Sequence, residues 1–543
     1  MYNTSYILFY VATSNNALLN NQRMHYNIML CLGESFVVRA ADVVRTLRQK
    51  IIAVCRKLGI GVCLRTVVLI FCLTFFWVQL HMSDVADNEA IQILAKPDGL
   101  LDANDSMLQL VPQHLHKYLV ALHQRDRPHQ AILPGNASEH VANTATSLNA
   151  SEIRRLIDQQ NSKQAVYNED VYGPLQNDSL VIVIQVHTRI MYLRHTIVSL
   201  ARARGIENAL LIFSHDHYDE QINELIQMID FCKTMQIFYP YSIQTNPFSF
   251  PGESPDDCPR DITKSEAIKR KCINAMHPDQ YGHYREAKFT QTKHHWWWKA
   301  NRVFNELDIV SNFSGPILFL EDDHYVAEDF IYMLKLMVKS CRVACPQCSI
   351  LSLGTYLKTY NFYGEAKKDI LRVIRRQQIF AAELTPPSWS FKIVPSFSHY
   401  DKAEISQWIS SKHNMGMAYN RTVWKKIVDC ADTFCKYDDY NWDWSLQSVS
   451  NNCLSHEFKV FVLKAPRVFH IGECGVHHKK SCFDMALIAK VQKLLSSVYK
   501  YLFPDKLEVT YAPIKKKVLR KGNGGWGDIR DHELCLRLVN HQW

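Results

Sequence analysis

The positions of apolar residues divide the chain into an anchor-like N-terminal part and a longer, regularly patterned part. The run LGIGVCLRTVVLIFCLTFFWVQL spans residues 58–80 and contains one charge, Arg65. It is about as long as the ~20 residues that cross a bilayer core, and Arg65 lies near enough to its start to reach the interface. A helix buried in a protein core is the alternative. We predict a transmembrane helix.

The sequence after this run is polar and weakly patterned as far as residue 176. Such a texture is typical of a stem or linker, and it contains one short helical stretch at Glu152–Gln160. Residues 1–57 show no clear periodicity. We therefore expect a tail at 1–57, a signal anchor at 58–80, a stem at 81–176 and one folded domain at 177–543.

Strand and helix patterns alternate at the start of that domain. The run LVIVIQV (180–186) suits a strand buried on both faces, an amphipathic stretch follows at 192–203, and ALLIF (209–213) is a second buried strand. Strand, helix and strand in this order predict a parallel sheet and an α/β fold. Because ligands bind at the carboxyl ends of such strands, Arg189 and Asp216 should lie at a binding crevice. The first strand is not followed by G-x-G-x-x-G, so a dinucleotide cofactor is not indicated.

The charge pattern gives the anchor a direction. The chain has a formal net charge of +9, and seven Lys or Arg residues against one acid lie between Arg39 and Arg65. Acidic and polar residues follow the apolar run, so the basic side should stay in the cytosol and the C-terminal part should be lumenal. A cleaved signal peptide fits poorly because the run starts far from Met1. Basic groups gathered beside an anchor also argue against a nucleic-acid partner.

Cysteines and glycosylation sequons agree with a lumenal domain. Twelve of the sixteen cysteines follow the anchor, which suits disulfides in an oxidising compartment. Six sequons also follow it, at Asn104, Asn136, Asn149, Asn177, Asn312 and Asn420. A seventh, at Asn3, would face the cytosol and stay unused.

The strongest chemical signal is PILFLEDDHYVAEDF (316–330), in which an apolar strand ends at Glu321-Asp322-Asp323-His324. Consecutive carboxylates at a strand end are costly to bury without a partner. Carboxylate oxygens are the ligands that Mg²⁺ or Mn²⁺ prefers, so we expect a divalent metal site here. A solvated acidic loop is the alternative.

A second acidic segment, YDDYNWDWSLQ (437–447), interleaves aspartates with aromatic rings. Aromatic faces stack on sugars and carboxylates bond hydroxyls, so this pattern suits a sugar site. Burial between two tryptophans could raise the pKa of Asp443 and make it a general base. A helix N-terminus with ordinary core tryptophans is the competing interpretation.

Histidines, cysteines and tryptophans mark three further segments. His470 follows the short apolar strand VFVLKAPRVF, and Cys474 and Cys482 then flank a His-rich loop. Their spacing lacks the C-x-x-C pair of a zinc site, so a small disulfide loop is expected. Cys345-Pro-Gln-Cys348 does have this spacing; a structural disulfide is favoured over a redox-active pair. KHHWWWK (293–299) should open a helix whose tryptophans pack mostly in the core.

Together these segments closely resemble the N-acetylglucosaminyltransferase II family, the alpha-1,6-mannosyl-glycoprotein 2-beta-N-acetylglucosaminyltransferases. The segments that carry the resemblance are QVHTR (185–189), FSHD (213–216), QTKHHWWWK (291–299), LEDDHY (320–325), YDDYNWDW (437–444), FHIGECGVHHKKSC (469–482) and NGGWGDIRDHELC (523–535). The resemblance covers roughly Asn177 to Cys535. It implies a GT-A-type fold, a nucleotide-binding and mostly parallel sheet flanked by helices, and a catalytic role for residues 177–543.

The resemblance also implies an activity and a location. Members transfer GlcNAc from UDP-GlcNAc, with inversion, to the 2-hydroxyl of the α1,6-arm mannose of N-glycans, which commits hybrid glycans to the complex type. The protein is expected in the Golgi membrane as a single-pass type II protein with a lumenal catalytic domain. Alternatives are a β1,2-GlcNAc transferase acting on the α1,3 arm or on O-linked mannose, a noncatalytic Golgi lectin, and a metal-dependent hydrolase.

Residue roles are carried over from the family in the same way. Asp443 would be the catalytic base, and Asp323 and His470 would bind Mn²⁺. The donor would be held by the following residues: Gln185, Val186, His187, Thr188, Arg189, Asp216, Gln291, Thr292, Lys293, His294 and His295. The family usually has Glu-Glu-Asp where this chain has Glu321-Asp322-Asp323, which shortens the middle side chain and keeps the metal ligand.

Five disulfides are implied by the resemblance. They would join Cys258 with Cys272, Cys345 with Cys348, Cys430 with Cys453, Cys435 with Cys535, and Cys474 with Cys482. Cys232 and Cys341 would remain free.

Overall fold

The computed structural model describes residues 111–120, 148–356, 399–472, 485–512 and 521–540. All of them belong to one compact unit, Val111–Trp543. Within these ranges no helix has the length and apolar character needed to span a bilayer. The membrane span predicted at 58–80 lies outside the described residues.

The centre of the fold is a ten-stranded sheet with the order β1-β4-β3-β2-β5-β9-β7-β10-β8-β12. Its strands are β1 (Val166–Tyr167), β2 (Leu180–Val186), β3 (Ala209–His215), β4 (Lys233–Phe238), β5 (Ile317–Glu321), β7 (Ile350–Ser352), β8 (Lys402–Gln407), β9 (Met417–Tyr419), β10 (Lys459–Leu463) and β12 (Glu508–Tyr511). The neighbours β4, β3, β2 and β5 all run parallel. The carboxyl ends of β2, β3 and β5 therefore meet at one edge.

Two short strands form a separate ribbon beside that edge. β6 (His324–Val326) pairs antiparallel with β11 (Val468–His470), and His324 lies opposite His470. This pairing brings two segments that are distant in the sequence to the end of β5.

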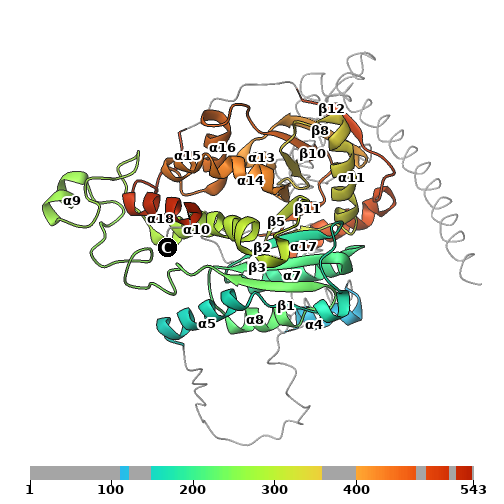
Figure 1. The fold of residues 1–543 in the computed structure, drawn as a ribbon, viewed down its shortest axis with the longest axis horizontal. Coiled ribbons are helices and arrows are strands. Elements are labelled where there is room, and N and C mark those ends of the chain that lie inside the picture. Colours follow the sequence, from blue (N-terminus) through green and yellow to red (C-terminus); the bar gives the residue numbers. More distant parts are fainter. Residues whose placement is uncertain (1–110, 121–147, 357–398, 473–484, 513–520, 541–543) are drawn as a thin grey trace, which may run out of the picture. The chain divides into compact units, whose positions relative to one another are not determined.

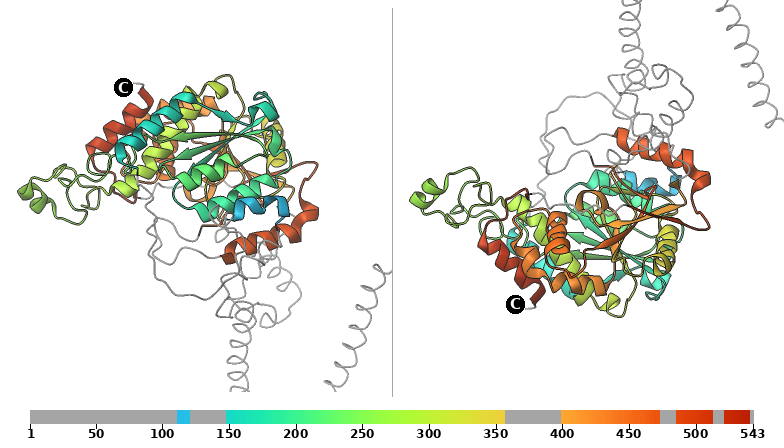
Figure 2. Two further views of the ribbon diagram at one scale, coloured as in Figure 1. Left: turned by 90° about the horizontal axis from the view of Figure 1, so that it is seen from below. Right: turned by 90° about the horizontal axis from the view of Figure 1, so that it is seen from above.

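Helices cover both faces of the sheet (Figures 1 and 2). They are α4 (His116–Leu119), α5 (Ala150–Lys163), α6 (Glu169–Tyr172), α7 (Ile190–Ala201), α8 (Glu220–Gln227), α9 (Lys264–Arg270), α10 (Ala287–Asn301), α11 (Phe330–Ala344), α13 (Ser410–His413), α14 (Arg421–Val428), α15 (Ala431–Lys436), α16 (Trp442–Asn452), α17 (Met485–Val498) and α18 (Ile529–Asn540). A π-helical turn, Arg302–Glu306, continues α10.

Alternate residues of each central strand enter different cores, as the pleat of a strand requires. Ile182 and Ile184 of β2 pack in one core with α7, α8 and α11. Val181 and Val183 pack in the other with α10, α14, α16 and α18. A parallel strand covered on both faces reads as a continuous apolar run, which is why β2 was predicted with its full bounds. The α/β class predicted from the sequence is confirmed as a mixed fold with a large, mostly parallel sheet.

Residues from the predicted stem are part of this fold. Leu115 and Tyr118 are buried in the first core, and the Tyr118 hydroxyl donates to Asp230 Oδ1 at 2.6 Å. The helix expected at 152–160 is present as α5, and its Ile153 and Ile157 pack against Phe238 of β4. Ordered packing on the sheet thus begins before residue 177.

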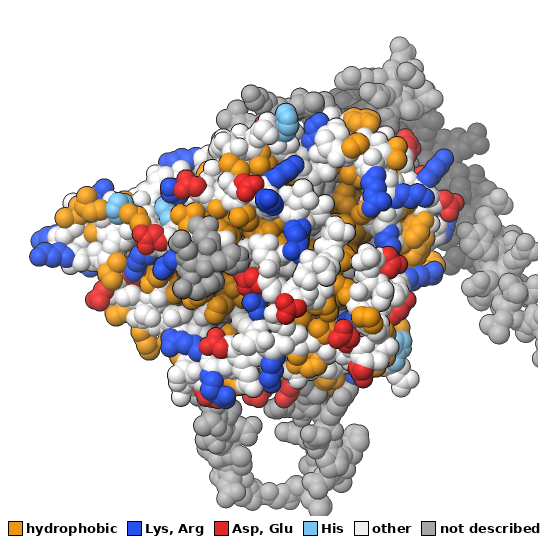
Figure 3. Space-filling model, in the orientation of Figure 1, with side chains coloured by type: hydrophobic (Ala, Val, Ile, Leu, Met, Phe, Trp, Pro, Cys, Tyr) orange, Lys and Arg blue, Asp and Glu red, His pale blue; other side chains and the backbone are white. Residues whose placement is uncertain are grey.

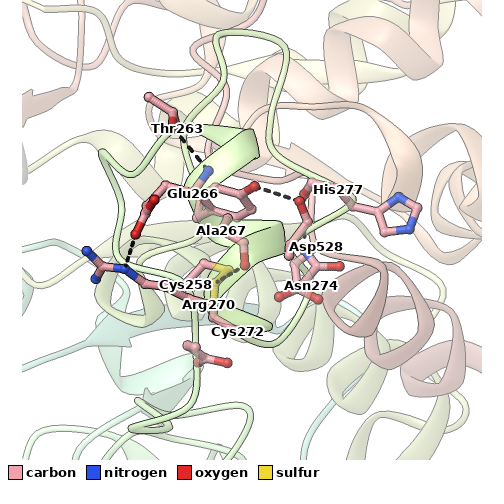
Figure 4. The surroundings of a disulfide bond; sticks show 12 residues. Cys258, Thr263, Glu266, Ala267, Arg270, Cys272, Asn274, His277 and Asp528 are labelled. Carbon is pink, nitrogen blue, oxygen red and sulfur yellow. Dashed lines mark hydrogen bonds and ion pairs between the residues drawn. A yellow bond between two sulfur atoms is a disulfide. The ribbon is translucent and has the colours of Figure 1, made fainter.

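The loop between β4 and α10 carries α9 away from the sheet (Figure 1). Figure 4 shows the Cys258–Cys272 disulfide, which joins the segments on either side of α9, with Thr263 capping the helix and Glu266 paired with Arg270. Lysine and arginine side chains mark the tip of this protrusion in Figure 3. A disulfide suits a segment that has only a small core of its own.

The cysteine pairing implied by the resemblance is confirmed wherever the structure describes it. The disulfides are Cys258–Cys272, Cys345–Cys348, Cys430–Cys453 and Cys435–Cys535. Cys232 and Cys341 are free and buried. The fifth predicted pair, Cys474 with Cys482, lies outside the described residues.

Candidate active site

Asp216 organises one side of the site at the carboxyl ends of β2 and β3. Its Oδ1 lies 2.6 Å from His187 Nδ1, and its Oδ2 accepts from Gln291 Nε2 at 3.1 Å. His295 Nδ1 lies 3.6 Å from the same Oδ2, and His295 Nε2 contacts Ser214 Oγ at 2.8 Å. Burial lowers the pKa of His187, but the Asp216 carboxylate outweighs it and raises the net pKa. Residues from β2, β3 and α10 are therefore joined in one polar network.

Asp322, the middle acid of the triplet, has a structural role. Asp322 is buried, its Oδ2 accepts from the His187 backbone N at 3.1 Å, and its Oδ1 pairs with Arg189. Its backbone oxygen accepts from Thr196 Oγ1 at 2.8 Å. Since both carboxylate oxygens have partners, Asp322 holds the β2–α7 turn against β5. A shorter side chain than the glutamate usual in the family is sufficient for this role.

Asp323 has a different environment, which suits a metal ligand. Its Oδ2 pairs with Arg189 Nη1 at 2.6 Å and lies 3.3 Å from His470 Nε2. Its Oδ1 is buried and has no hydrogen-bond partner among the residues that the structure describes. Donor atoms of Glu321, Asp323 and His324 all lie within 4.8 Å of one another.

The surroundings of Asp323 allow close approach. A Cβ on Gly472 would lie 2.2 Å from Asp323 Oδ2, so any other residue would crowd the carboxylate. Hard carboxylate oxygens beside imidazole nitrogens form a donor set that fits Mn²⁺ or a similar divalent ion. The predicted pair Asp323 and His470 is brought together, and Glu321 and His324 join it as further possible ligands.

Asp443 is the second residue of α16 and is half-buried. Its Oδ2 accepts from Asn414 Nδ2 at 3.0 Å and its Oδ1 from the Trp444 backbone N at 3.0 Å. Burial is the main cause that raises the pKa of Asp443 to about 7, and the nearby Asp439 adds to it. A carboxyl group with such a pKa can accept a proton near neutral pH.

Asp443 and the cluster of Glu321, Asp323 and His324 lie in one site. The charge of Glu321 also raises the pKa of Asp443, so the two groups lie within electrostatic reach. Tyr356 lies between them: its ring centroid is 5.4 Å from that of His470, and burial, Glu321 and Asp443 raise its pKa. Sequence reasoning missed Tyr356, because a lone tyrosine after a short strand carries no motif.

Other predicted donor residues point into the protein. Lys293 is buried, and its Nζ donates to the backbone oxygens of Tyr437 and Asp439 at 3.1 and 3.0 Å. His294 Nε2 lies 2.9 Å from Asp531 Oδ1. These two residues face away from Asp216, whereas Gln291 and His295, which are four residues apart, share the side of α10 that faces it.

Of the remaining predicted residues, Gln185 and Val186 lie on β2, Thr188 follows it, and Thr292 lies on α10. Val186 is buried, Gln185 accepts from Lys299 Nζ, Thr188 is exposed, and Thr292 is half-buried.

The tryptophans of α10 pack in the core against the start of α16. Trp296, Trp297 and Trp298 are all buried, and Trp296 stacks on Trp442 with centroids 4.5 Å apart and planes within 3°. The residue before Asp443 is therefore fixed by α10, and the predicted core role of the tryptophans is confirmed.

The chain is similar in sequence to known proteins. The sequence profile of the family described as N-acetylglucosaminyltransferase II (MGAT2) matches residues 154–379 and 392–535. The alpha-1,6-mannosyl-glycoprotein 2-beta-N-acetylglucosaminyltransferase of Rattus norvegicus is 45% identical over 70% of this chain and 79% of its own length. The enzyme of that name from Homo sapiens is 45% identical over 70% and 78%, and the one from Arabidopsis thaliana 32% identical over 68% and 76%.

One solved structure, a crystal structure of S. aureus TarS 1-349, is 7% identical and superimposes with a TM-score of 0.25 over 60% of this chain and 66% of that chain. This likeness is too slight to support a conclusion about the fold. The family match covers most of the chain and all the described segments that build the site. The chain belongs to the N-acetylglucosaminyltransferase II family.

Proposed function

We propose that this chain transfers GlcNAc from UDP-GlcNAc, in β1,2 linkage, to the α1,6-arm mannose of an N-glycan. Family membership and relatives that carry this activity in their names support the proposal. The observation that carries it is the shared site of a half-buried carboxyl group, Asp443, and the acidic cluster around Asp323. A catalytic base and a nearby metal site can together perform a sugar transfer from a nucleotide donor.

The donor would lie at the carboxyl ends of β2, β3 and β5, as in a GT-A-type fold. Asp323 and His470 would hold Mn²⁺, with Glu321 and His324 beside them. The ion, when bound, supplies positive charge that stabilises the diphosphate leaving group. His187, Gln291 and His295 would orient the donor through the network around Asp216.

Asp443 would act on the acceptor. Its carboxylate accepts the proton of the mannose 2-hydroxyl while that oxygen attacks the anomeric carbon of GlcNAc. The bond from this carbon to the UDP oxygen breaks as the new glycosidic bond forms. A single displacement of this kind inverts the α-linked donor to a β-linked product and needs no covalent enzyme intermediate.

The anchor and the lumenal cysteines suggest where the reaction occurs. The apolar run at 58–80 with its basic flank would fix a single-pass type II protein in the Golgi membrane. The catalytic residues would then face the lumen, where N-glycans are processed.

The experiment that tests this function uses matched acceptors. The full chain is given UDP-GlcNAc, Mn²⁺ and N-glycans with or without GlcNAc on the α1,3 arm, and both UDP and product are measured. We expect transfer only to the glycan already substituted on the α1,3 arm, and loss of transfer when Mn²⁺ is chelated. Transfer to the unsubstituted glycan would indicate the α1,3-arm enzyme, release of free GlcNAc a hydrolase, and binding without turnover a lectin.

A further inference from the structure

We infer that Asp439 is the positioning residue that fixes the catalytic base: it holds the turn before α16 and so sets where the Asp443 carboxylate points. This inference rests on the proposed role of Asp443. It gives a task within the reaction to an aspartate that lies four residues before the base and is fully buried.

Asp439 uses both carboxylate oxygens to bind two separate segments. Oδ1 accepts from the backbone N and the Nδ2 of Asn441, at 2.8 and 2.9 Å. Oδ2 accepts from the backbone N and the Nδ2 of Asn523, at 2.8 and 3.0 Å. Asn441 is the residue before the first turn of α16, so the first pair of bonds fixes where this helix begins.

The second pair of bonds ties that turn to residues 522–526, which we call the strap. The Tyr440 backbone N donates to Gly524 O at 3.2 Å, and the Trp526 backbone N donates to Asp438 Oδ1 at 3.0 Å. Gly524 and Gly525 have φ of +78° and +76°, a backbone conformation that other residues rarely adopt. The strap therefore follows a path that brings Asn523 against Asp439.

A buried lysine, Lys293 of α10, contacts both the turn and the strap. Lys293 Nζ donates to the Asp439 backbone oxygen at 3.0 Å and lies 3.9 Å from the centroid of the Trp526 ring. Burial lowers the pKa of Lys293 to about 7, and the nearby charges of Asp439 and Asp438 oppose this shift. The turn before the base is thus held by α10, the strap and its own carboxylate.

The charge of Asp439 has an effect on the pKa of Asp443 that a purely structural role of Asp439 would not explain. The groups that face Asp443 are Asp439 before α16, Glu321 at the end of β5, Tyr356 after β7 and Asn414 after α13. Asp439 has a larger effect than Glu321 on the pKa of Asp443, and it raises that pKa. Neutralising it should lower that pKa, so the catalytic base stays ionised at lower pH.

The test compares Asp439→Asn with the wild-type chain and with Asp432→Asn, which makes the same change at an exposed position of α15. Asparagine keeps the shape of the side chain but places an amide where four donors converge. We expect kcat to fall by about tenfold or more with KM for UDP-GlcNAc unchanged, since the base is misplaced and the donor site is not. The acidic limb of the kcat profile should move to lower pH by on the order of 0.5 units.

Asn523→Ala provides a second measurement if Asp439→Asn does not fold. It removes one donor and keeps the backbone bond to Asp439, so we expect a smaller fall in kcat at unchanged KM. Unchanged kcat in a folded variant would overturn the inference. Activity lost only in proportion to unfolded protein, with the pH limb unmoved, would also overturn it. Full activity in Asp443→Asn would instead reject the proposed base, which separates the two failures.

Discussion

Asp438, Asp439 and Asp443 lie in one short acidic and aromatic segment, yet their partners give them different roles. The Asp438 carboxylate accepts from the backbone N of Gln280 and of Trp526. Asp439 holds Asn441 and Asn523. Asp443 has one amide and one backbone donor and remains half-exposed beside the acidic cluster. Of the three, Asp443 lies closest in charge interaction to Glu321 of the acidic cluster, and it is the carboxylate that we propose to meet a substrate hydroxyl.

Replacing the proposed base tests this distinction. Asp443→Asn keeps the size of the side chain and removes its ability to accept a proton, so kcat should fall by about 10²- to 10⁴-fold. Binding of UDP with Mn²⁺, measured by calorimetry, should stay within about twofold, since these ligands would contact other residues. A variant with wild-type kcat would remove the assignment.

The pH dependence of the reaction should report the same group. Burial and Asp439 raise the pKa of Asp443 to about 7, and the base acts only when deprotonated. The value of kcat/KM should therefore fall as the pH drops through about 7, rather than through the ~3.9 of an ordinary aspartate. Assays at saturating Mn²⁺ with UDP binding as the control measure this limb, and a midpoint near 4 would contradict the account.

At this scale the sequence indicated which acidic segments lie near one another better than it indicated the direction in which each side chain points. Asp323 and Asp443 were recognisable because each follows a distinctive apolar or aromatic pattern. Lys293 and His294 were expected to contact the donor, yet the structure turns their polar atoms to the backbone of Tyr437 and Asp439 and to Asp531. Which face of a helix meets a ligand depends on packing by distant segments, which local sequence does not contain.

At the scale of elements, long buried strands were predictable and short paired ones were not. β2 matches its apolar run because a strand that is covered by helices on both faces has apolar residues at nearly every position. β6 and β11 have three residues each and exist through their pairing with one another. His470 was expected to follow a single short strand at 460–469, while the structure divides that segment into β10 and β11 and places His470 in β11 opposite His324.

The disulfide between α15 and α18 should stabilise the elements around the base. Cys435 and Cys535 are 100 residues apart, whereas Cys345 and Cys348 are separated by three. Because cross-linking a longer loop restricts the unfolded chain more, the Cys435→Ala/Cys535→Ala variant should lose about 2–5 kcal/mol in free energy of unfolding. Denaturant titration measures this loss, with Cys345→Ala/Cys348→Ala as the matched control. An equal or larger loss in the control would contradict the loop argument.

At the scale of the whole molecule, the glycosylation sequons can test the proposed type II topology. Asn312 and Ser314 are exposed in the turn before β5, at the end of the strand opposite the site, so a glycan there would leave the site open. We expect Asn312 to be glycosylated in the full chain expressed in cells, and Asn3 to be unmodified. Mass spectrometry after enzymatic deglycosylation in heavy-oxygen water reads both positions. Glycosylation of Asn3 without glycosylation of Asn312 would show that the protein has the opposite orientation in the membrane.

The structure of the product tests the central claim most directly. The full chain is incubated with UDP-GlcNAc, Mn²⁺ and an N-glycan bearing GlcNAc on the α1,3 arm, and the purified product is analysed by proton NMR. We predict one new GlcNAc, β-configured and linked to the 2-position of the α1,6-arm mannose. An α-configured linkage, a new residue on any other sugar, or an unmodified acceptor would contradict the account.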